Sequence, residues 1–328
     1  MKDEILIHTH FHKRKTGVTV SIENVLPHLS SRIRTYIYGY GIEGNKISFR
    51  ELIKKLRQNP KSIIHAHRNN EILFFLILKL LRFRFFLVYT RHSETKPSSL
   101  TTFLMRKADQ LISLTPSMNQ NLSIPSIVIG HGVDIDIFKP SDVLLENIRQ
   151  PKLIVCVGRI RKAKGQKTLL EAAAPLLFEH NDWAIAFLGK VDKEDYKQML
   201  NEIVSKNGIA EQVYFLGEVS DIVKYYQYAK AAVIASHTEG FSLTCVEAMA
   251  SGCTTFATKD VGIHSKLIDD KNNGYLFDVG NSDSLSKLLG LLFKGEIPYL
   301  GQKARLEVER NWSAQNEADQ LLEVYRSR

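Results

Sequence analysis

Cysteine is scarce in this chain of 328 residues: there are three, Cys156, Cys245 and Cys253, and none forms a CxxC pair. A small, odd number without that spacing argues against a disulfide framework and a zinc site, and it suits a reducing cytosol. A long unbroken apolar run is also lacking, because lysine and arginine interrupt residues 72–88. We therefore expect no membrane-spanning helix. We also expect no signal peptide, because the first four residues run straight into a strand pattern.

Acidic residues are few in the first half of the chain. Residues 1–150 hold 22 lysines and arginines against 12 aspartates and glutamates, whereas residues 151–328 hold 22 against 23. A basic half predicts an anionic partner. We do not expect nucleic acid, because no helix-turn-helix, zinc-finger or RNP pattern accompanies the charge. An anionic membrane surface or an acidic acceptor is the better hypothesis, and the candidate contacts are Lys13, Arg14, Lys15, Arg82 and Arg84.

Strand and helix patterns alternate along the chain in two consecutive series. This length suits two domains of roughly 150 residues each. The two series predict an α/β protein with two Rossmann-like, doubly wound domains of parallel strands that face a ligand cleft. We place these domains at 1–148 and 149–312. Residues 313–328 are expected to form a helix that packs back on the first domain, because its apolar residues Leu321, Leu322, Val324 and Tyr325 need cover.

The apolar segment at residues 72–81 has a helical length. Its default interpretation is a core helix packed on the first sheet, and the alternative is a helix that dips into a membrane. Three histidines, His8, His10 and His12, alternate along the first strand pattern. Neither a carboxylate nor a cysteine joins them, so we predict no metal site.

One stretch of the second half has the pattern of an anion site. Residues 239–252 lie between apolar strand patterns at 231–235 and 254–258, and they contain a loop followed by a helix. Ser242 or Thr244 can cap that helix, whose N-terminal N–H groups and dipole attract phosphate. Glu239 and Glu247 bracket the site, which suits a ligand with hydroxyl groups around a diphosphate, such as a nucleotide sugar. Alternatively, Thr244 and Glu247 form a capping box and bind only backbone.

A second motif, together with the first, carries a family resemblance. Gly158-Arg159 and Lys164-Gly165 enclose a basic loop after a strand pattern, and Glu239 and Glu247 follow about 75 residues later. This combination resembles the family 4 retaining glycosyltransferases of the GT-B fold. The resemblance continues at residues 131–134, 215–217 and 273–277. It implies a metal-independent, cofactor-free transfer of a hexose from a nucleotide diphosphate sugar, with retention of configuration.

The resemblance also implies roles for single residues. Arg159 and Lys164 would bind the diphosphate and offset the charge of the leaving group; otherwise they belong to a solvated basic loop. Glu247 would bind the ribose and Glu239 the donor sugar, while His92 would lie near donor sugar and acceptor. The expected catalytic residues are therefore His92, Arg159, Lys164 and Glu239, and the expected donor-binding residues are Gly17, Gly158, Val219, Gly240, Phe241, Ser242, Leu243 and Glu247.

A narrower resemblance concerns the first half of the chain. Residues 13–19 with residues 67–71 resemble bacterial lipopolysaccharide core mannosyltransferases, which implies GDP-mannose as the donor and an anionic glycolipid or saccharide as the acceptor. The first domain would then bind the acceptor and the second the donor, in a cytoplasmic protein peripheral to the inner face of the cytoplasmic membrane. The acceptor candidates are Lys13, Arg14, Lys15, His67 and Arg68. Two alternatives stay open, a sugar-nucleotide epimerase of the same fold and a non-catalytic nucleotide-sugar-binding protein.

Overall fold

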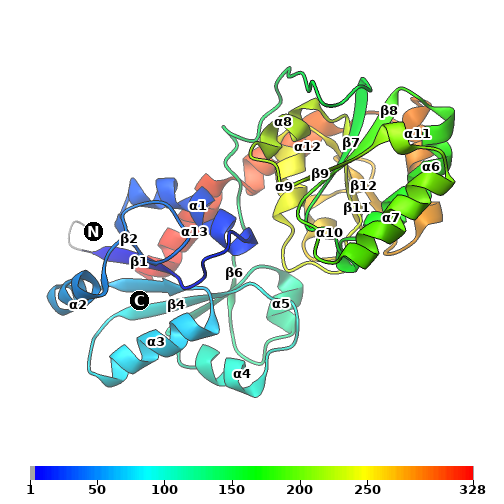
Figure 1. Ribbon diagram of the computed structural model, residues 1–328. Coiled ribbons are helices and arrows are strands. Elements are labelled where there is room, and N and C mark those ends of the chain that lie inside the picture. The colour runs from blue at the N-terminus through cyan, green and yellow to red at the C-terminus, as the bar shows by residue number, and fades with distance from the viewer. Residues whose placement is uncertain (1–3, 328) are drawn as a thin grey trace. The chain divides into compact units, whose positions relative to one another are not determined.

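The chain forms two compact units in the computed structural model, which describes residues 4–327 (Figure 1). The first unit runs to Asp134 and includes the chain again from Trp312, and the second comprises Ile135–Asn311. Each unit holds one six-stranded parallel sheet covered by helices, which confirms the predicted class of two doubly wound α/β domains. The predicted domain limits at 148 and 312 stay a prediction, because the two units are defined by contacts between residues and not by independent folding.

The first unit contains a sheet of order β2-β1-β3-β4-β5-β6. Its strands are β1 (Ile5–His10), β2 (Arg34–Gly39), β3 (Ile63–Ala66), β4 (Phe86–Arg91), β5 (Gln110–Ser113) and β6 (Ile127–Val128). Its helices are α1 (Gly17–Ser30), α2 (Phe49–Gln58), α3 (Asn69–Leu80), α4 (Ser99–Met105), α5 (Pro116–Gln120) and α13 (Ala314–Arg326). Among residues 4–327 no helix has the length and apolar character needed to cross a membrane.

The two faces of this sheet carry different helices. Side chains alternate along each strand, so that in β1 Leu6 joins one core and Ile5 and Ile7 the other. The core of Leu6 includes residues of α1 and α13, which lie side by side in Figure 1. The opposite core includes residues of α2, α3 and α4. The C-terminal helix therefore packs on the first sheet as predicted, and its four predicted apolar residues are all buried.

The second unit repeats this plan with a sheet of order β12-β11-β10-β7-β8-β9. Its strands are β7 (Lys152–Val157), β8 (Trp183–Leu188), β9 (Val213–Gly217), β10 (Ala231–Ile234), β11 (Thr254–Thr258) and β12 (Tyr275–Phe277). Its α-helices are α6 (Gln166–Glu179), α7 (Glu194–Lys206), α8 (Ile222–Tyr228), α9 (Leu243–Ala250), α10 (His264–Leu267), α11 (Ser282–Phe293) and α12 (Gly301–Asn311), and short 3-10 turns span Lys162–Lys164 and Ala210–Gln212.

Each sheet has a point at which the order of its strands reverses. In the first unit it lies between β1 and β3, and in the second between β7 and β10. The loops that leave two such neighbouring strands turn to opposite faces, which opens a crevice at the carboxyl ends where α/β proteins bind ligands. Most of the predicted site residues follow these four strands or lie on the helices that come after them.

Candidate functional site

The loop after β7 depends on two glycines. Gly158 has a φ of +138°, and a Cβ added there would lie 3.4 Å from the side chain of Lys164. Gly165 has a φ of +68°, and its Cβ would lie 1.9 Å from the carbonyl oxygen of Ala235, just after β10. The positive φ favours glycine at both positions, and at Gly165 the close contact also excludes any side chain. The loop therefore packs against the end of β10, and Lys164 lies across its opening glycine.

Lys164 and Glu239 form an ion pair at the strand-order reversal of the second unit. The Lys164 Nζ lies 2.5 Å from Glu239 Oε1, which also accepts a hydrogen bond from Ser236 Oγ at 2.6 Å. The side chains of the pair are 16% and 11% exposed. Burial raises the pKa of Glu239, but the Lys164 charge and both hydrogen bonds outweigh it and hold that pKa below its ordinary value. Two predicted catalytic residues thus form one ionised pair.

Arg159, the third predicted catalytic residue of this unit, is much more exposed. Its guanidinium lies 3.4 Å from the carboxylate of Asp192, and its side chain is 57% exposed. A surface pair of this kind is weak. Arg159 is therefore held loosely beside its loop and can turn to an anionic ligand at small cost, whereas Lys164 is already fixed.

The loop before α9 is strained at Ser242. This residue has a φ of +101° and ψ of +63°, in the left-handed region that non-glycine residues seldom adopt. Its hydroxyl lies 2.9 Å from His264 Nε2, while His264 Nδ1 lies 2.9 Å from the carbonyl oxygen of Thr258 and donates to it. His264 Nε2 is then an acceptor, and Ser242 donates. The Ser242 side chain consequently does not cap α9, and such local strain is typical of functional loops.

Glu247 does not belong to a capping box. Helix α9 begins at Leu243, so Thr244 is its second residue and not its N-cap, and the capping interpretation is wrong. Glu247 Oε2 instead accepts a hydrogen bond from Tyr226 Oη at 3.2 Å. Burial raises the pKa of Glu247 to about 7, against the hydrogen bond of Tyr226 and the charge of Lys164. This carboxylate therefore titrates near neutral pH.

The remaining donor-site candidates of the second unit lie on these loops. Phe241 is buried and its carbonyl oxygen accepts the N–H of Ile263 at 3.1 Å. Gly240, Leu243 and Val219 are partly exposed, and Val219 follows β9 at the same edge of the sheet. Gly262 packs against this segment, since a Cβ there would lie 2.8 Å from Glu239 Cβ. The loops after β10 and β11 therefore contact each other, and the loop after β9 leaves the sheet at the same edge.

In the first unit the predicted acceptor residues surround the start of α1. Thr16 occupies the N-cap position, and a Cβ added at Gly17 would meet nothing within 4 Å. The guanidinium of Arg68 lies 3.4 Å from Thr16 Oγ1, which joins the loop after β3 to the loop after β1. Lys15 pairs with Glu23 at 2.9 Å. The two other basic residues of the loop, Lys13 and Arg14, are exposed.

Glu71 connects the same two loops and was not predicted as a site residue. It is buried on α3 and accepts hydrogen bonds from Thr9 Oγ1 at 2.7 Å, from the N–H of Phe11 at 3.0 Å and from the N–H of His67 at 2.7 Å. Burial raises the pKa of Glu71 although these hydrogen bonds oppose the rise. Its three donors come from β1 and the loops after β1 and β3, so this carboxylate fixes the crevice of the first unit.

Histidines line the carboxyl end of the first sheet on the α1 and α13 face. His92 contacts two others: its Nε2 lies 3.0 Å from His67 Nδ1 and its Nδ1 lies 3.2 Å from His131 Nε2. An overlapping group consists of His8, His65 and His67, each of which offers one ligand atom within 4.8 Å of the others. Both nitrogens of His65 already contact hydroxyls, those of Tyr325 and Thr90 at 2.7 Å. His10 does not join this group.

The period-2 alternation of strands was the signal that could have found this row. Leu6 and His8 share one face of β1, and Ile63 and His65 share one face of β3, while His92 follows Val88 by four positions just after β4 ends. Leu6, Ile63 and Val88 all belong to the core under α1 and α13. A histidine that follows such a residue by an even number of positions within the strand therefore points toward the same face.

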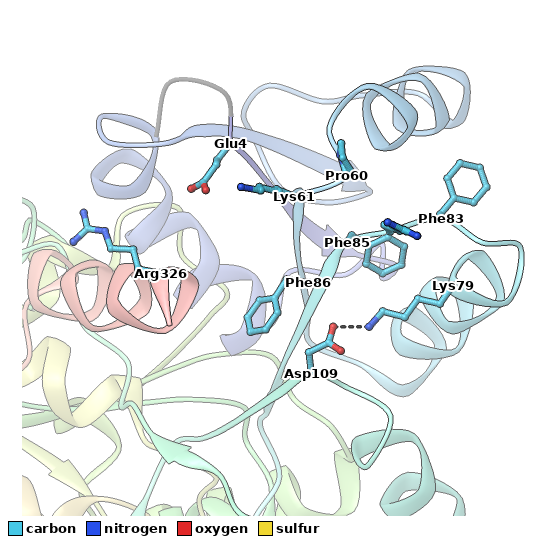
Figure 2. A pocket seen from close by; sticks show the side chains of 10 residues that line it. Glu4, Pro60, Lys61, Lys79, Phe83, Phe85, Phe86, Asp109 and Arg326 are labelled. Atoms are coloured by element: carbon cyan, nitrogen blue, oxygen red, sulfur yellow. Dashed lines mark hydrogen bonds and ion pairs between the residues drawn. The ribbon is translucent and has the colours of Figure 1, made fainter. Parts of the chain in front are cut away.

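A hollow elsewhere on the first unit contains no predicted site residue. It has a volume of about 740 Å³ and lies before the strands, at the amino edge of the sheet (Figure 2). Lys79 and Asp109 pair across it at 2.5 Å. Its lining is basic and aromatic and includes Lys61, Phe83, Arg84, Phe85, Phe86 and Arg326. The histidine row lies at the opposite edge of the same sheet.

The sequence of the second unit matches a known protein family, and the site geometry of that unit agrees with the match. The family described as Glycosyl transferases group 1 matches residues 145–313, about half of the chain and nearly all of the second unit. The chain belongs to this family. As a group 1 glycosyltransferase, it is 29% identical over its whole length to the lipopolysaccharide core biosynthesis mannosyltransferase LpcC of Rhizobium leguminosarum bv. viciae, 97% of which is covered. It is 28% identical to the lipopolysaccharide core biosynthesis mannosyltransferase LpsB of Rhizobium meliloti (strain 1021), 98% of which is covered.

Solved structures show the same fold at lower identity. HepE from Anabaena, in complex with UDP, superimposes with a TM-score of 0.82 at 18% identity, and each chain covers all of the other. The lipopolysaccharide outer core galactosyltransferase WaaB, in its apo form, superimposes with a TM-score of 0.73 at 17% identity. The superposition covers 97% of this glycosyltransferase and 98% of WaaB. The glycosyltransferase therefore has the GT-B fold that its sequence motifs predict.

Proposed function

We propose that this glycosyltransferase transfers mannose from GDP-mannose to a lipopolysaccharide core or other anionic glycolipid acceptor, with retention of configuration and without a metal ion. The observation that carries the proposal is the buried Lys164–Glu239 ion pair at the strand-order reversal of the second unit. The choice of mannose and of this acceptor is supported by LpcC and LpsB, both named lipopolysaccharide core mannosyltransferases and both matched over nearly their whole length.

The second unit would bind the donor. Lys164 and Arg159 offset the negative charge that grows on the diphosphate as the glycosidic bond breaks, and cations fixed in advance do this most effectively. The N–H groups at the start of α9 bind the phosphates, because Ser242 leaves them uncapped. Glu239 accepts from hydroxyls of the sugar and Glu247 from those of the ribose. The base lies along Val219.

The first unit would bind the acceptor. His92 lies near the transferred sugar, and the leaving phosphate helps to remove the acceptor's proton. The basic loop of Lys13, Arg14 and Lys15 attracts the acidic groups of the acceptor together with Arg68, and His67 borders the same crevice. Gly17 offers open space and N–H groups at the start of α1 for the donor phosphates. The first unit, with 22 lysines and arginines against 12 acids, suits an anionic acceptor.

An anionic lipid surface would be the second partner of the first unit, on the inner face of the cytoplasmic membrane. Helix α3 buries Ile72, Phe75 and Leu78 but leaves an apolar surface exposed, with Leu80 83% exposed. This surface, the α3 surface, consists of Leu73, Ile77, Leu80 and Leu81. Arg82 and Arg84, both exposed, follow it directly. Apolar side chains beside basic ones are typical of helices that lie on anionic membranes.

A transfer assay tests the proposed function. The protein is incubated with GDP-mannose and a truncated lipopolysaccharide core, and GDP release, mannose transfer and the anomeric configuration of the product are measured. Lys164→Ala and Arg159→Ala should each reduce turnover roughly a hundredfold or more, as for the loss of an electrostatic donor. Lys162→Ala is the matched control, because this lysine is an exposed member of the same loop.

The same assay separates the rival functions. An epimerase would change the sugar of the donor without acceptor, and a binding protein would release no nucleotide. UDP-glucose serves as the competing donor. Transfer only from UDP-glucose would overturn the choice of donor, and near-normal turnover of Lys164→Ala would overturn the site.

A further inference from the structure

We propose that Glu317 of the C-terminal helix is a positioning residue for His92. Through His131, it sets the direction of an unbroken row of hydrogen bonds along four histidines, and so decides which ring nitrogen of His92 carries the hydrogen. The consequence for catalysis rests on the proposed function, because it requires that His92 lies near the transferred sugar. The direction of the row itself does not depend on that role.

The row begins at the carboxylate of Glu317, whose two oxygens both accept hydrogen bonds. Glu317 is 6% exposed, and its Oε1 lies 2.9 Å from His131 Nδ1. Its Oε2 accepts the backbone N–H of Gly132 at 2.8 Å. A carboxylate that accepts at both oxygens leaves His131 to donate, so the hydrogen of His131 toward Glu317 lies on Nδ1. One side chain thus holds both the histidine and the loop that presents it.

Three further contacts continue the row with one repeating pattern. His131 Nε2 lies 3.2 Å from His92 Nδ1, His92 Nε2 lies 3.0 Å from His67 Nδ1, and His67 Nε2 lies 3.2 Å from His8 Nδ1. Every contact therefore joins an Nε2 of one ring to an Nδ1 of the next. The row ends at His8 Nε2, which is buried without a hydrogen-bond partner among residues 4–327.

Uncharged imidazoles can form such a row in only two directions. A neutral ring has one nitrogen that donates and one that accepts, so the choice at one ring determines the next. Burial lowers the pKa of His8 to about 3, and it lowers the pKa of His67 and of His92 well below the ordinary value, so these three rings are uncharged. When His131 holds a single hydrogen, that hydrogen lies on Nδ1 toward Glu317, and it forces Nδ1–H on His92, then on His67 and His8.

The direction decides what His92 offers to a ligand. With the hydrogen on Nδ1, its Nε2 is an acceptor, which accepts from His67 here and would accept from a sugar hydroxyl that replaced His67. With the opposite direction, the same nitrogen would donate. Glu317, far from His92 in sequence and reached only through His131, therefore selects a hydroxyl donor as the partner of His92.

Glu317→Gln reverses the row without changing the shape of the side chain. The amide has one oxygen, and the backbone N–H of Gly132 can only donate, so it takes that oxygen. The amide N–H₂ then faces His131 Nδ1, which must become an acceptor. His131 then carries its hydrogen on Nε2, and His92, His67 and His8 follow.

NMR of the histidine rings tests this directly. In the full chain labelled with ¹⁵N and ¹³C histidine, at about pH 8 and so well above the ordinary imidazole pKa of about 6.5, each tautomer is read from its ring shifts, and single His→Asn variants assign them. We expect Nδ1–H on all four rings of the wild type and Nε2–H on all four in Glu317→Gln. Glu323→Gln, an exposed glutamate of the same helix, is the matched control and should change none of them.

Each result decides one claim. Nε2–H on His92 of the wild type, a doubly protonated His131 at that pH, or unchanged tautomers in Glu317→Gln would each overturn the proposal. The wild-type spectrum tests the direction even if the variant fails to fold. In the transfer assay we expect Glu317→Gln to lower kcat about tenfold, below the loss expected for a catalytic histidine, with little change in donor KM. Full turnover of His92→Ala would overturn the role of His92 and leave the direction intact.

Discussion

At the scale of single residues, the two glutamates of the candidate donor site, Glu239 and Glu247, have different pKa values because their surroundings differ. Glu239 lies beside a lysine, and the pair keeps its pKa low although it is nearly buried. Glu247 has no cation within hydrogen-bonding distance among the described contacts, only the hydroxyl of Tyr226, and burial raises its pKa to about 7. The pKa of one carboxylate is therefore lowered and that of the other is raised.

Glu247→Gln should make the stability of the protein respond differently to pH. The unfolded pKa of a glutamate is about 4.3, so between roughly pH 4.3 and 7 the folded protein binds more protons than the unfolded chain. This contribution to stability therefore falls as the pH rises through that window. Above it, the buried charge costs about 4 kcal/mol. About 2.6 kcal/mol of this cost appears between pH 5 and pH 8, so the melting temperature of the variant should rise by roughly 5–10 °C relative to the wild type over that range.

Glu211→Gln is the control for this comparison. Its side chain is 83% exposed in a pair with Arg149, and exposed pairs contribute little to stability. The difference between this variant and the wild type should hardly change with pH. If the difference for Glu247→Gln were equally constant, Glu247 would titrate far from neutral pH.

How much of the candidate site can be predicted from the sequence also differs from residue to residue. The sequence predicted Lys164 and Glu239 as residues of one donor site, but their ion pair became visible only in the fold, where β7 and β10 are neighbours. The partnership of Glu317 with His131 could not, since 186 positions separate them and no motif marks either as a partner of the other. Ser242 was predicted as a helix cap, yet its hydroxyl contacts a histidine that only the tertiary fold brings near.

At the scale of elements, apolar runs predicted which segments form strands because buried parallel strands are apolar on both faces. They could not predict how much of a helix is covered. Residues 72–81 read as a core helix, but α3 starts at Asn69 and buries only part of its apolar surface. An apolar run has no period from which its covered side can be read, so the α3 surface became visible only in the fold.

The C-terminal helix should stabilise the first unit through its apolar face. Leu322 on α13 is 2% exposed in a core shared with α1 and with β1, β3, β4 and β5. Leu322→Ala removes this side chain and leaves a cavity, which typically costs about 2–5 kcal/mol of the free energy of unfolding. Urea unfolding followed by circular dichroism measures the loss. Leu80→Ala, at an 83% exposed position of the same unit, is the control and should cost far less.

At the scale of the whole molecule, charge divides as the fold does. The first unit holds 22 lysines and arginines against 12 acids, and the second holds 22 against 23. The first unit therefore carries all of the net positive charge, together with the exposed apolar residues of the α3 surface. Net charge alone is compatible with a protein that is simply kept dissolved. Charge beside exposed apolar side chains favours a surface that binds anionic lipid.

Vesicle sedimentation tests whether the first unit binds lipid. Each basic side chain near an anionic bilayer contributes about 1 kcal/mol, so Arg82→Gln with Arg84→Gln should weaken binding roughly 30-fold. Screening acts within about 8 Å at physiological salt, so binding should fall steeply as salt rises. Lys206→Ala with Lys294→Ala removes the same charge from exposed positions of the second unit and should change little. Leu80→Asp should weaken binding, unlike Leu144→Asp at a 90% exposed position. Equal binding to neutral and anionic vesicles, or equal losses from both arginine and lysine variants, would leave the charge without a membrane role.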